Sequence, residues 1–267
     1  MDTNNDTAKD RISRIDSYGF ERPDGFDYAS YEDFYSRYMT VLTRRAMKWS
    51  KMMQKSTAVE KGIKVKRYIR KGIPDEHRPH VWMMVSGAQA QMETNPGYYH
   101  SVLLEGQKNT KLVDAVVTDY YSPEMMGLKT DQEVLGVLVK MKIPAVAELI
   151  DRHDVMWTLL VSRWFICLFI DVLPIETVLR IWDCLFYEGS KILFRVALTL
   201  IKQYQAYILE AKNFPDVCDK FKDITKGKFV TECHLFMQRI FTEPGNLSKS
   251  TIERLREQRR AQLLSQE

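Results

Sequence analysis

Residues that could perform catalysis or bind a metal ion are few in this sequence, and their spacing fits neither task. His77 and His80 stand three residues apart and would share one face of a helix, but no third ligand follows at a suitable spacing. Asp151 and Asp154 lie on either side of Arg152, a pattern typical of a solvated helix end rather than of an acid–base pair. We therefore predict no metal ion, no cofactor and no covalent chemistry performed by this chain.

Motifs of phosphate-binding loops and of hydrolases are missing as well. The chain contains no GxxxxGK[ST] loop, no GxSxG elbow and no HExxH pair. An enzyme with covalent or metal chemistry of its own is therefore not expected, and composition and spacing alone indicate an intracellular helical protein.

The strongest charge feature is a basic region from residue 40 to residue 71. It holds eleven Lys and Arg against the single acid Glu60. A solvated helix face, an anionic membrane surface and an acidic partner all fit this composition, and these alternatives stay open. Nucleic acid fits less well, because only Trp49 and Tyr68 could stack on bases. The densest cluster, which we predict as an anionic-surface contact, is Lys64, Lys66, Arg67, Arg70 and Lys71.

The chain also carries indications of a cytoplasmic protein. Its opening residues are polar, which predicts no secretory signal. The most apolar window, residues 155–170, is shorter than the roughly 20 residues that span a bilayer and contains Arg163, so we expect a buried core helix there. Four widely spaced cysteines are expected to be reduced thiols: Cys167, Cys184, Cys218 and Cys233.

The elements that must position any site are predicted to be helices. Apolar residues recur at three- and four-residue steps from Tyr31 to Met53, again over residues 112–117, and over residues 192–204. The spacing of Thr130 and Glu133 is that of a capping box and predicts a helix start. We predict an all-α, irregular multi-helix fold with no strand and no internal repeat.

Helix boundaries are predicted from Pro and Gly in the second half of the chain. Pro174 is expected to open a helix and Gly189 to end it. Ser190 is expected to cap the helix that follows, and the charged segment after Ser248 is predicted to form a terminal helix.

Two stretches resemble the TBC domain, the all-helical module of Rab GTPase-activating proteins. The stretch GIPDEHRPHVW, residues 72–82, is similar to the opening signature of that domain. Residues 162–201, which include LRIWDCLFYEG, resemble its second half nearly motif for motif. The resemblance covers roughly residues 28–264, and it predicts an internally truncated TBC-type domain.

The resemblance implies how such proteins act on a partner. The family inserts an arginine from an Ile-x-x-Asp-x-x-Arg motif and a glutamine from a Tyr-Cys-Gln-Gly type motif beside the GTP of a Rab protein. The guanidinium neutralises charge that develops on the separating phosphoryl group, and the amide orients the attacking water. An arginine finger supplies about 10³ to 10⁵ in rate for small GTPases.

Both motifs are incomplete in this chain. When residues 116–122 are laid on the arginine motif, Val116 takes the place of Ile, Asp119 matches, and Ser122 stands where the arginine belongs. No Tyr-Cys-Gln-Gly segment exists, and Asp119 runs almost directly into a stretch that follows several helices later in the family. We interpret the sequence as a TBC domain that lacks an internal block, as an alternatively spliced product would, and the alternative is a diverged family member with a compact loop.

Other residues that match family motifs are expected to be structural rather than catalytic: Arg78, Trp82, Arg180, Trp182, Asp183, Glu188 and Gly189. The expected division of the chain is a flexible arm over residues 1–30, a basic helix and linker over residues 31–71, the TBC-like domain over residues 72–245, and a helical tail over residues 246–267.

The resemblance implies a GTP-bound Rab-family small GTPase as partner, with no nucleic acid. It implies a cytoplasmic location, with peripheral association with endomembranes left open. We expect catalysis to be impaired, and the alternative is a non-catalytic helical scaffold that binds a protein or an anionic membrane. Without the block, we expect the apolar stripes of residues 112–117 and 192–204 to lose packing partners.

Overall fold

The computed structural model describes residues 14–16, 18–22, 24–54, 59, 61–98 and 120–265. Apart from an isolated antiparallel bridge between Ile15 and Glu21, the regular elements of these residues are helices, which confirms the all-α prediction. The helices are α1 (Tyr28–Met53), α2 (Ile63–Lys71), α3 (Arg78–Ser86), α4 (Ala88–Thr94), α6 (Met126–Lys142), α7 (Pro144–Arg152), α8 (Trp157–Ile166), α9 (Ile175–Glu188), α10 (Lys191–Gln203), α11 (Gln205–Leu209), α12 (Phe214–Asp223), α13 (Lys228–Thr231), α14 (Cys233–Thr242) and α15 (Lys249–Leu264).

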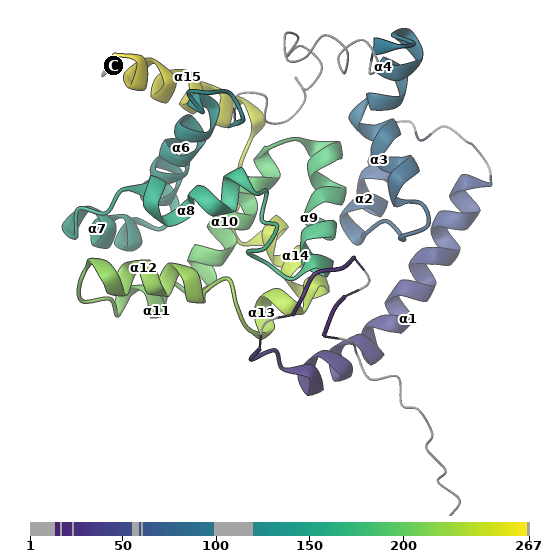
Figure 1. Cartoon of the computed structure of the whole chain (residues 1–267), viewed down its shortest axis with the longest axis horizontal. Helices are drawn as coiled ribbons and strands as arrows, with labels where there is room; N and C mark the ends of the chain where they lie inside the picture. The colour runs from purple at the N-terminus through teal and green to yellow at the C-terminus, as the bar shows by residue number, and fades with distance from the viewer. Residues whose placement is uncertain are drawn as a thin grey trace, which may run out of the picture.

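Helices α9, α10 and α14 form the centre of the molecule (Figure 1). α10 is almost entirely enclosed, since its apolar residues from Ile192 to Ile201 are all buried. The expectation that residues 192–204 lose their packing partners is therefore wrong for these side chains. They pack against α6, α9 and α14, so helices present in this chain bury the apolar stripe of α10.

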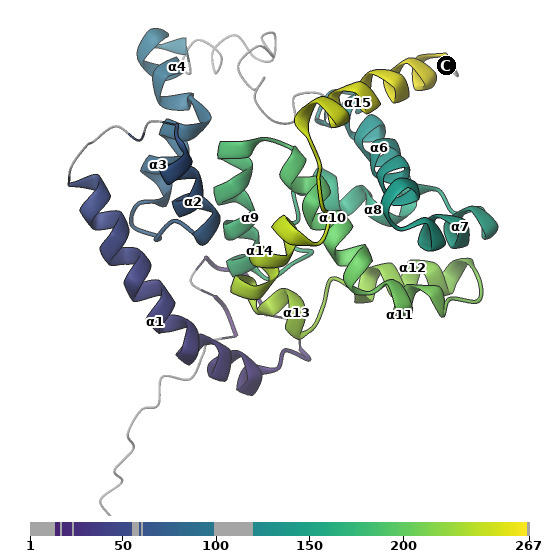
Figure 2. The ribbon, with the colours of Figure 1, turned by 180° about the vertical axis from the view of Figure 1, so that it is seen from behind.

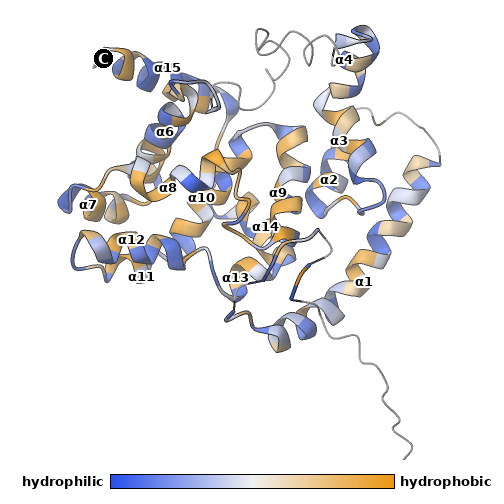
Figure 3. Cartoon of the chain, viewed as in Figure 1, coloured by the Kyte–Doolittle hydropathy of each residue, from blue (hydrophilic) through white to orange (hydrophobic). Residues whose placement is uncertain are grey.

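The remaining helices lie on two sides of this centre. On one side α6 packs against α7, α8 and α15, and α11 and α12 lie below them (Figures 1 and 2). On the other side α2 and α3 pack against α9, and the long α1 runs along the outside. Figure 3 shows apolar residues concentrated on the central helices, while α1 and α12 carry hydrophilic residues on much of their surface.

The apolar window at residues 155–170 is not one long helix. α8 ends at Ile166, and Leu168, Phe169 and Asp171 then have positive φ values of 48°, 67° and 59°. This conformation is uncommon for residues other than glycine. It turns Phe169 fully into the core, and the indole of Trp182 donates to the Leu168 carbonyl at 3.0 Å. Packing thus ends a helix in which the sequence contains no stop signal.

Two predicted caps are also wrong. α6 begins at Met126, so Thr130 lies inside the helix with its hydroxyl buried and without a hydrogen-bond partner, and it is not an N-cap. Ser190 precedes α10 but makes no capping hydrogen bond, because its hydroxyl accepts from Arg256 instead. The predictions for Pro174 and Gly189 are confirmed, since α9 starts directly after Pro174 and ends directly before Gly189, whose φ is +81°.

The described cysteines are free thiols, with Cys184 and Cys233 buried. None of the helices in the described part of the chain is both long and apolar enough to cross a membrane. The predicted helix over residues 112–117, together with Val116 and Asp119, lies outside the described residues.

Candidate functional site

The family-motif residues of the two resembling stretches meet around the buried carboxylate of Asp183. One Asp183 oxygen accepts from Arg78 Nε and from Trp82 Nε1, each at 2.9 Å, and the other accepts from the Ile73 amide at 3.0 Å. Residues that are 101 to 110 positions apart in the chain are thereby joined. Burial raises the pKa of Asp183, and the positive charge and hydrogen bond of Arg78 oppose that shift.

Arg180 extends this group, which we call the Asp183 cluster (Ile73, Arg78, Trp82, Arg180 and Asp183). Arg180 Nε lies 4.0 Å from Asp183, and its two terminal nitrogens donate to the Tyr38 hydroxyl at 2.7 Å and to the Arg70 carbonyl at 2.9 Å. The cluster thus connects α1, α2, α3 and α9. Most of its polar groups have hydrogen-bond partners on neighbouring helices, although Arg180 Nε is buried without one, and such bonds are expected for residues that fix helix packing.

A close approach of the backbone fixes the position of Arg180. Gly72 has φ of +108°, and a Cβ built there would lie 2.6 Å from Arg180 Nε. The Gly72 carbonyl accepts from the Trp49 indole at 3.0 Å. Glycine is required here both by the backbone conformation and by the space that the guanidinium occupies.

Trp82 of α3 and Trp182 of α9 pack together. Their ring centroids are 5.9 Å apart, and the Phe186 ring lies 4.9 Å from Trp82 and 6.0 Å from Trp182. This aromatic group holds α3 against α9. Together with the Asp183 cluster it supports a structural role for the motif residues.

Glu188 is a second anionic centre, on the last turn of α9. Its carboxylate accepts two hydrogen bonds from Arg70, at 2.5 and 2.7 Å, and it pairs with Lys66 at 3.3 Å and Lys191 at 3.1 Å. Burial acts to raise its pKa, but the hydrogen bonds and charges of Arg70 and Lys191 overcome this and lower the pKa to about 2.

The basic cluster predicted from the sequence is therefore divided between two faces of α2. Lys66 and Arg70 turn inward to Glu188. Lys64, Arg67 and Lys71 lie on the opposite face and line an open hollow.

Ser122, which the family resemblance predicts at the arginine position of the finger motif, lies in a turn that leads into α6. The Ser122 carbonyl accepts from the Met125 amide at 2.9 Å, and its side chain is half-buried. Two tyrosines directly precede Ser122. The exposed Tyr121 donates its hydroxyl to the Ile166 carbonyl at 2.8 Å, and Tyr120 before it is buried. The turn is thus held against α6 and α8 by two tyrosines.

Tyr120 also belongs to a buried network that sequence reasoning missed. Its hydroxyl donates to Asp131 at 2.5 Å, and Arg256 of α15 donates two hydrogen bonds to the same carboxylate, each at 2.7 Å. Arg256 also donates to the Ser190 hydroxyl at 2.8 Å. The only available signal was a single acid within the apolar stripe of α6. Nothing in the spacing linked it to an arginine 125 residues away.

Comparisons with known proteins agree with this geometry. Residues 110–209 match the family model of the Rab-GTPase-TBC domain. A crystal structure of the Chlamydomonas flagellar RabGAP TBC domain superposes with a TM-score of 0.64 at 24% identity, covering 85% of this chain and 99% of that chain. That likeness shows the fold. The chain belongs to the TBC-domain family of Rab GTPase-activating proteins.

Within that family the chain is similar to growth hormone-regulated TBC proteins. Growth hormone-regulated TBC protein 1 of Xenopus laevis is 57% identical over 341 positions, which cover the whole of both proteins. This chain has 267 residues, so at least 74 positions of that alignment face a gap in it. The Rattus norvegicus protein of the same name is 54% identical over 282 positions, covering 97% of this chain and 96% of that protein.

Proposed function

We propose that this chain is a catalytically impaired member of the Rab GTPase-activating family. Activation in this family requires a guanidinium and a carboxamide inside the nucleotide pocket of the partner. The observation that carries the proposal is Ser122, which occupies the arginine position of the finger motif and cannot supply a positive charge. The alignment with the frog protein, in which at least 74 positions face a gap in this chain, supports a loss of residues relative to that protein.

The surroundings of Ser122 support the same conclusion. Arg256, which is joined to Tyr120 through Asp131, has its guanidinium committed to that carboxylate and to Ser190. Another arginine could replace the finger only if it were free to enter a partner's pocket. Arg256 is two-thirds covered and points into its own protein.

An arginine and a glutamine do stand together on α15, where Arg259 donates to Gln262 at 2.8 Å. Both lie on the helical tail and are bonded to each other. Of the two hollows described for this chain, one is lined by Lys48, Ile63, Lys64, Arg67, Tyr68 and Lys71, and the other by Lys142, Ile143, Leu198, Lys202, Glu243, Pro244 and Gly245. Neither includes a glutamine.

The role that we propose for the impaired chain is binding without acceleration of GTP hydrolysis. Its partner would be a GTP-bound Rab-family small GTPase, bound by the TBC-like domain of residues 72–245. The arm of residues 1–30, the basic region of residues 31–71 and the tail of residues 246–267 would flank that domain. The close packing of α9, α10 and α14 supports a domain that folds without the block.

Phosphate release from a panel of GTP-loaded Rab proteins tests the proposal. The control is the same chain with the intervening segment of the frog relative inserted after Asp119. We expect the control to accelerate hydrolysis by at least one Rab protein, and this chain to leave the intrinsic rate unchanged. Acceleration by this chain equal to that of the control would overturn the proposed impairment. Retention of the same Rab protein on immobilised chain measures the remaining binding.

A further inference from the structure

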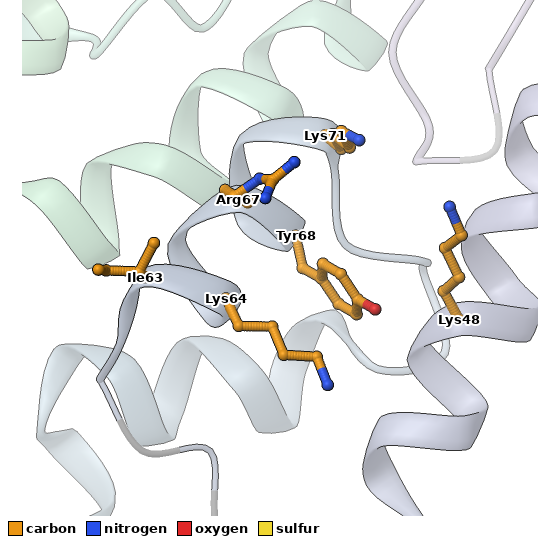
Figure 4. A pocket seen from close by; sticks show the side chains of 6 residues that line it. All are labelled: Lys48, Ile63, Lys64, Arg67, Tyr68 and Lys71. Carbon is orange, nitrogen blue, oxygen red and sulfur yellow. The ribbon is translucent and has the colours of Figure 1, made fainter.

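The outer face of α2 forms a basic hollow that the proposed function does not use. Lys64, Arg67 and Lys71 are spaced three and four residues apart, so they project from one side of the helix (Figure 4). Lys48 of α1 faces them across the hollow, with the Tyr68 ring between the two helices. The hollow has a volume of about 450 Å³.

The charge of this hollow is uncompensated within the described residues. No acid lines it, and none of its four cations forms an ion pair with a carboxylate there. On the inner face of the same helix, by contrast, Glu188 neutralises Lys66 and Arg70. The inner face of α2 therefore carries cations that form ion pairs with Glu188, and its outer face carries cations that are exposed to solvent.

α1 extends the same basic surface. Arg44 and Lys51 stand four residues before and three residues after Lys48, and all three side chains are exposed. Two further exposed cations thus share the face of α1 that carries Lys48, in addition to the four that line the hollow. A field of one sign on this scale attracts a polyanionic ligand.

An exposed apolar side chain lies at the edge of the hollow. Ile63 is the first residue of α2 and lines the hollow, yet 83% of its surface is accessible. A cationic surface that also presents an apolar side chain has the composition of membrane-surface binders, which combine charge attraction with shallow apolar insertion. Nucleic acid fits less well, because Tyr68 is the only aromatic residue that lines the hollow and it is half-buried.

We propose that this surface docks the protein on anionic membranes. The hollow between Lys48, Lys64, Arg67 and Lys71 receives the phosphorylated headgroup of a lipid, and Ile63 enters the interfacial layer beside it. Each basic residue close to an anionic surface strengthens binding about fivefold at low salt. The docking is independent of GTPase activation, because no residue of the Asp183 cluster and no residue of the 120–125 turn takes part.

Co-sedimentation of the full chain with lipid vesicles tests this site. The vesicles contain phosphatidylcholine alone, phosphatidylcholine with phosphatidylserine, or phosphatidylcholine with a phosphorylated phosphatidylinositol. The test variant is Lys64→Glu with Arg67→Glu. The matched control is Lys140→Glu with Lys212→Glu, which makes the same change of charge at exposed residues of other elements. A further variant, Ile63→Asp, tests the apolar contact without removing a cation.

We expect binding to anionic vesicles only, with a loss of at least tenfold in the Lys64→Glu, Arg67→Glu variant and less than threefold in the control. Ile63→Asp is expected to weaken binding even at a salt concentration that screens most of the charge attraction. Circular dichroism melting shows that each variant is folded.

Any of the following results would overturn the proposal: no binding to anionic vesicles at low salt, equal losses in test and control variants, or soluble inositol trisphosphate bound as tightly as the vesicles. The last would assign the hollow to a free phosphate compound. A stronger, lipid-independent retention on single-stranded nucleic acid would also overturn it.

Discussion

The hydroxyl of Tyr120 lies 2.5 Å from the Asp131 carboxylate, and this contact fixes the turn that carries Ser122 to the body of α6. Burial and the charge of Asp131 raise the pKa of Tyr120, so the phenol remains a donor at physiological pH. Ser122, which we propose to stand at the finger position, is thus a neutral side chain on a turn that follows a buried, hydrogen-bonded tyrosine.

Replacement of Tyr120 by Phe is expected to destabilise the chain by about 1 to 2 kcal/mol, because the Asp131 carboxylate loses one of its buried donors. The matched control is Tyr121→Phe, which removes a hydrogen bond from an exposed side chain and should cost less. Urea unfolding followed by circular dichroism measures both. Equal costs would contradict the buried network.

Substitution of Gly72 by Ala should cost more than substitution of Gly87 by Ala. Both glycines have positive φ, +108° and +87°, so both variants carry backbone strain. Only at Gly72 would the new methyl group meet another side chain, at 2.6 Å from Arg180 Nε, whereas no atom lies within 4 Å at Gly87. We expect about 1 kcal/mol for Gly87→Ala and at least about 3 kcal/mol for Gly72→Ala. Similar melting temperatures for the two variants would disprove this explanation.

Glu188 should make the stability of the folded chain dependent on acid pH. Its pKa is lowered from 4.5 to about 2 in the folded state. The ionised Glu188 therefore contributes its full stabilisation of the folded state above pH 4.5. This contribution is lost as the pH falls from 4.5 to 2. The shift corresponds to about 3 kcal/mol. Glu188→Gln is expected to abolish this part of the pH profile and, at pH 7, to leave the three cations around it without their anion. A profile that is unchanged below pH 4.5 would argue against the pairing.

His234 should produce a separate pH dependence at milder pH. Its Nδ1 lies 3.0 Å from Arg45 Nη2, and burial followed by the charges of Arg45, Arg180 and Lys71 lowers its pKa from 6.5 to about 4. Between pH 6.5 and 4 the unfolded chain binds a proton that the folded chain does not. The free energy of unfolding therefore decreases as the pH is lowered through this range. His234→Gln retains an acceptor for Arg45 and should remove this slope. The measurement is the free energy of unfolding of both proteins from pH 4 to 7.5. If the slope persists in His234→Gln, His234 is not its source.

Introduction of arginine at the finger position should not restore activity. In Ser122→Arg the guanidinium would extend from a turn that Tyr120 and Tyr121 hold, and no glutamine finger would stand beside it. We expect phosphate release from a Rab protein to remain within twofold of the intrinsic rate. A rise of a hundredfold or more would show that position 122 already points toward a bound GTPase.

The helical elements could largely be predicted from sequence, and the contacts that join them could not. Apolar periodicity placed the stripe of α10 correctly, because a helix face that packs on several neighbours must be apolar along its whole length. The turn after Ile166 was missed because Trp182 and the core around Phe169 impose it, and both depend on residues distant in the chain. For the same reason the sequence could not show that the Ser190 hydroxyl accepts a hydrogen bond from Arg256 rather than capping its own helix.

The motif residues illustrate the same limit at the candidate site. Arg78 and Asp183 stand out in the sequence through their family resemblance, but residue types alone could not show that they bond to each other across 105 positions. For the basic cluster, composition indicated an anionic contact but could not distinguish Lys66 and Arg70, which face Glu188, from the three cations on the opposite face. The two groups can be distinguished only when the residues that pack against α2 are known.

The two-sided charge of α2 also has a practical consequence during purification. The outward cations of α2 and Lys48 should bind sulfonate and phosphate groups on chromatography media more strongly than the net charge of +4 suggests. Polyphosphates from a cell extract would be retained in the same way and released by salt. Phosphate buffer would compete for this part of the surface, so the choice of buffer anion would change what the isolated protein carries with it.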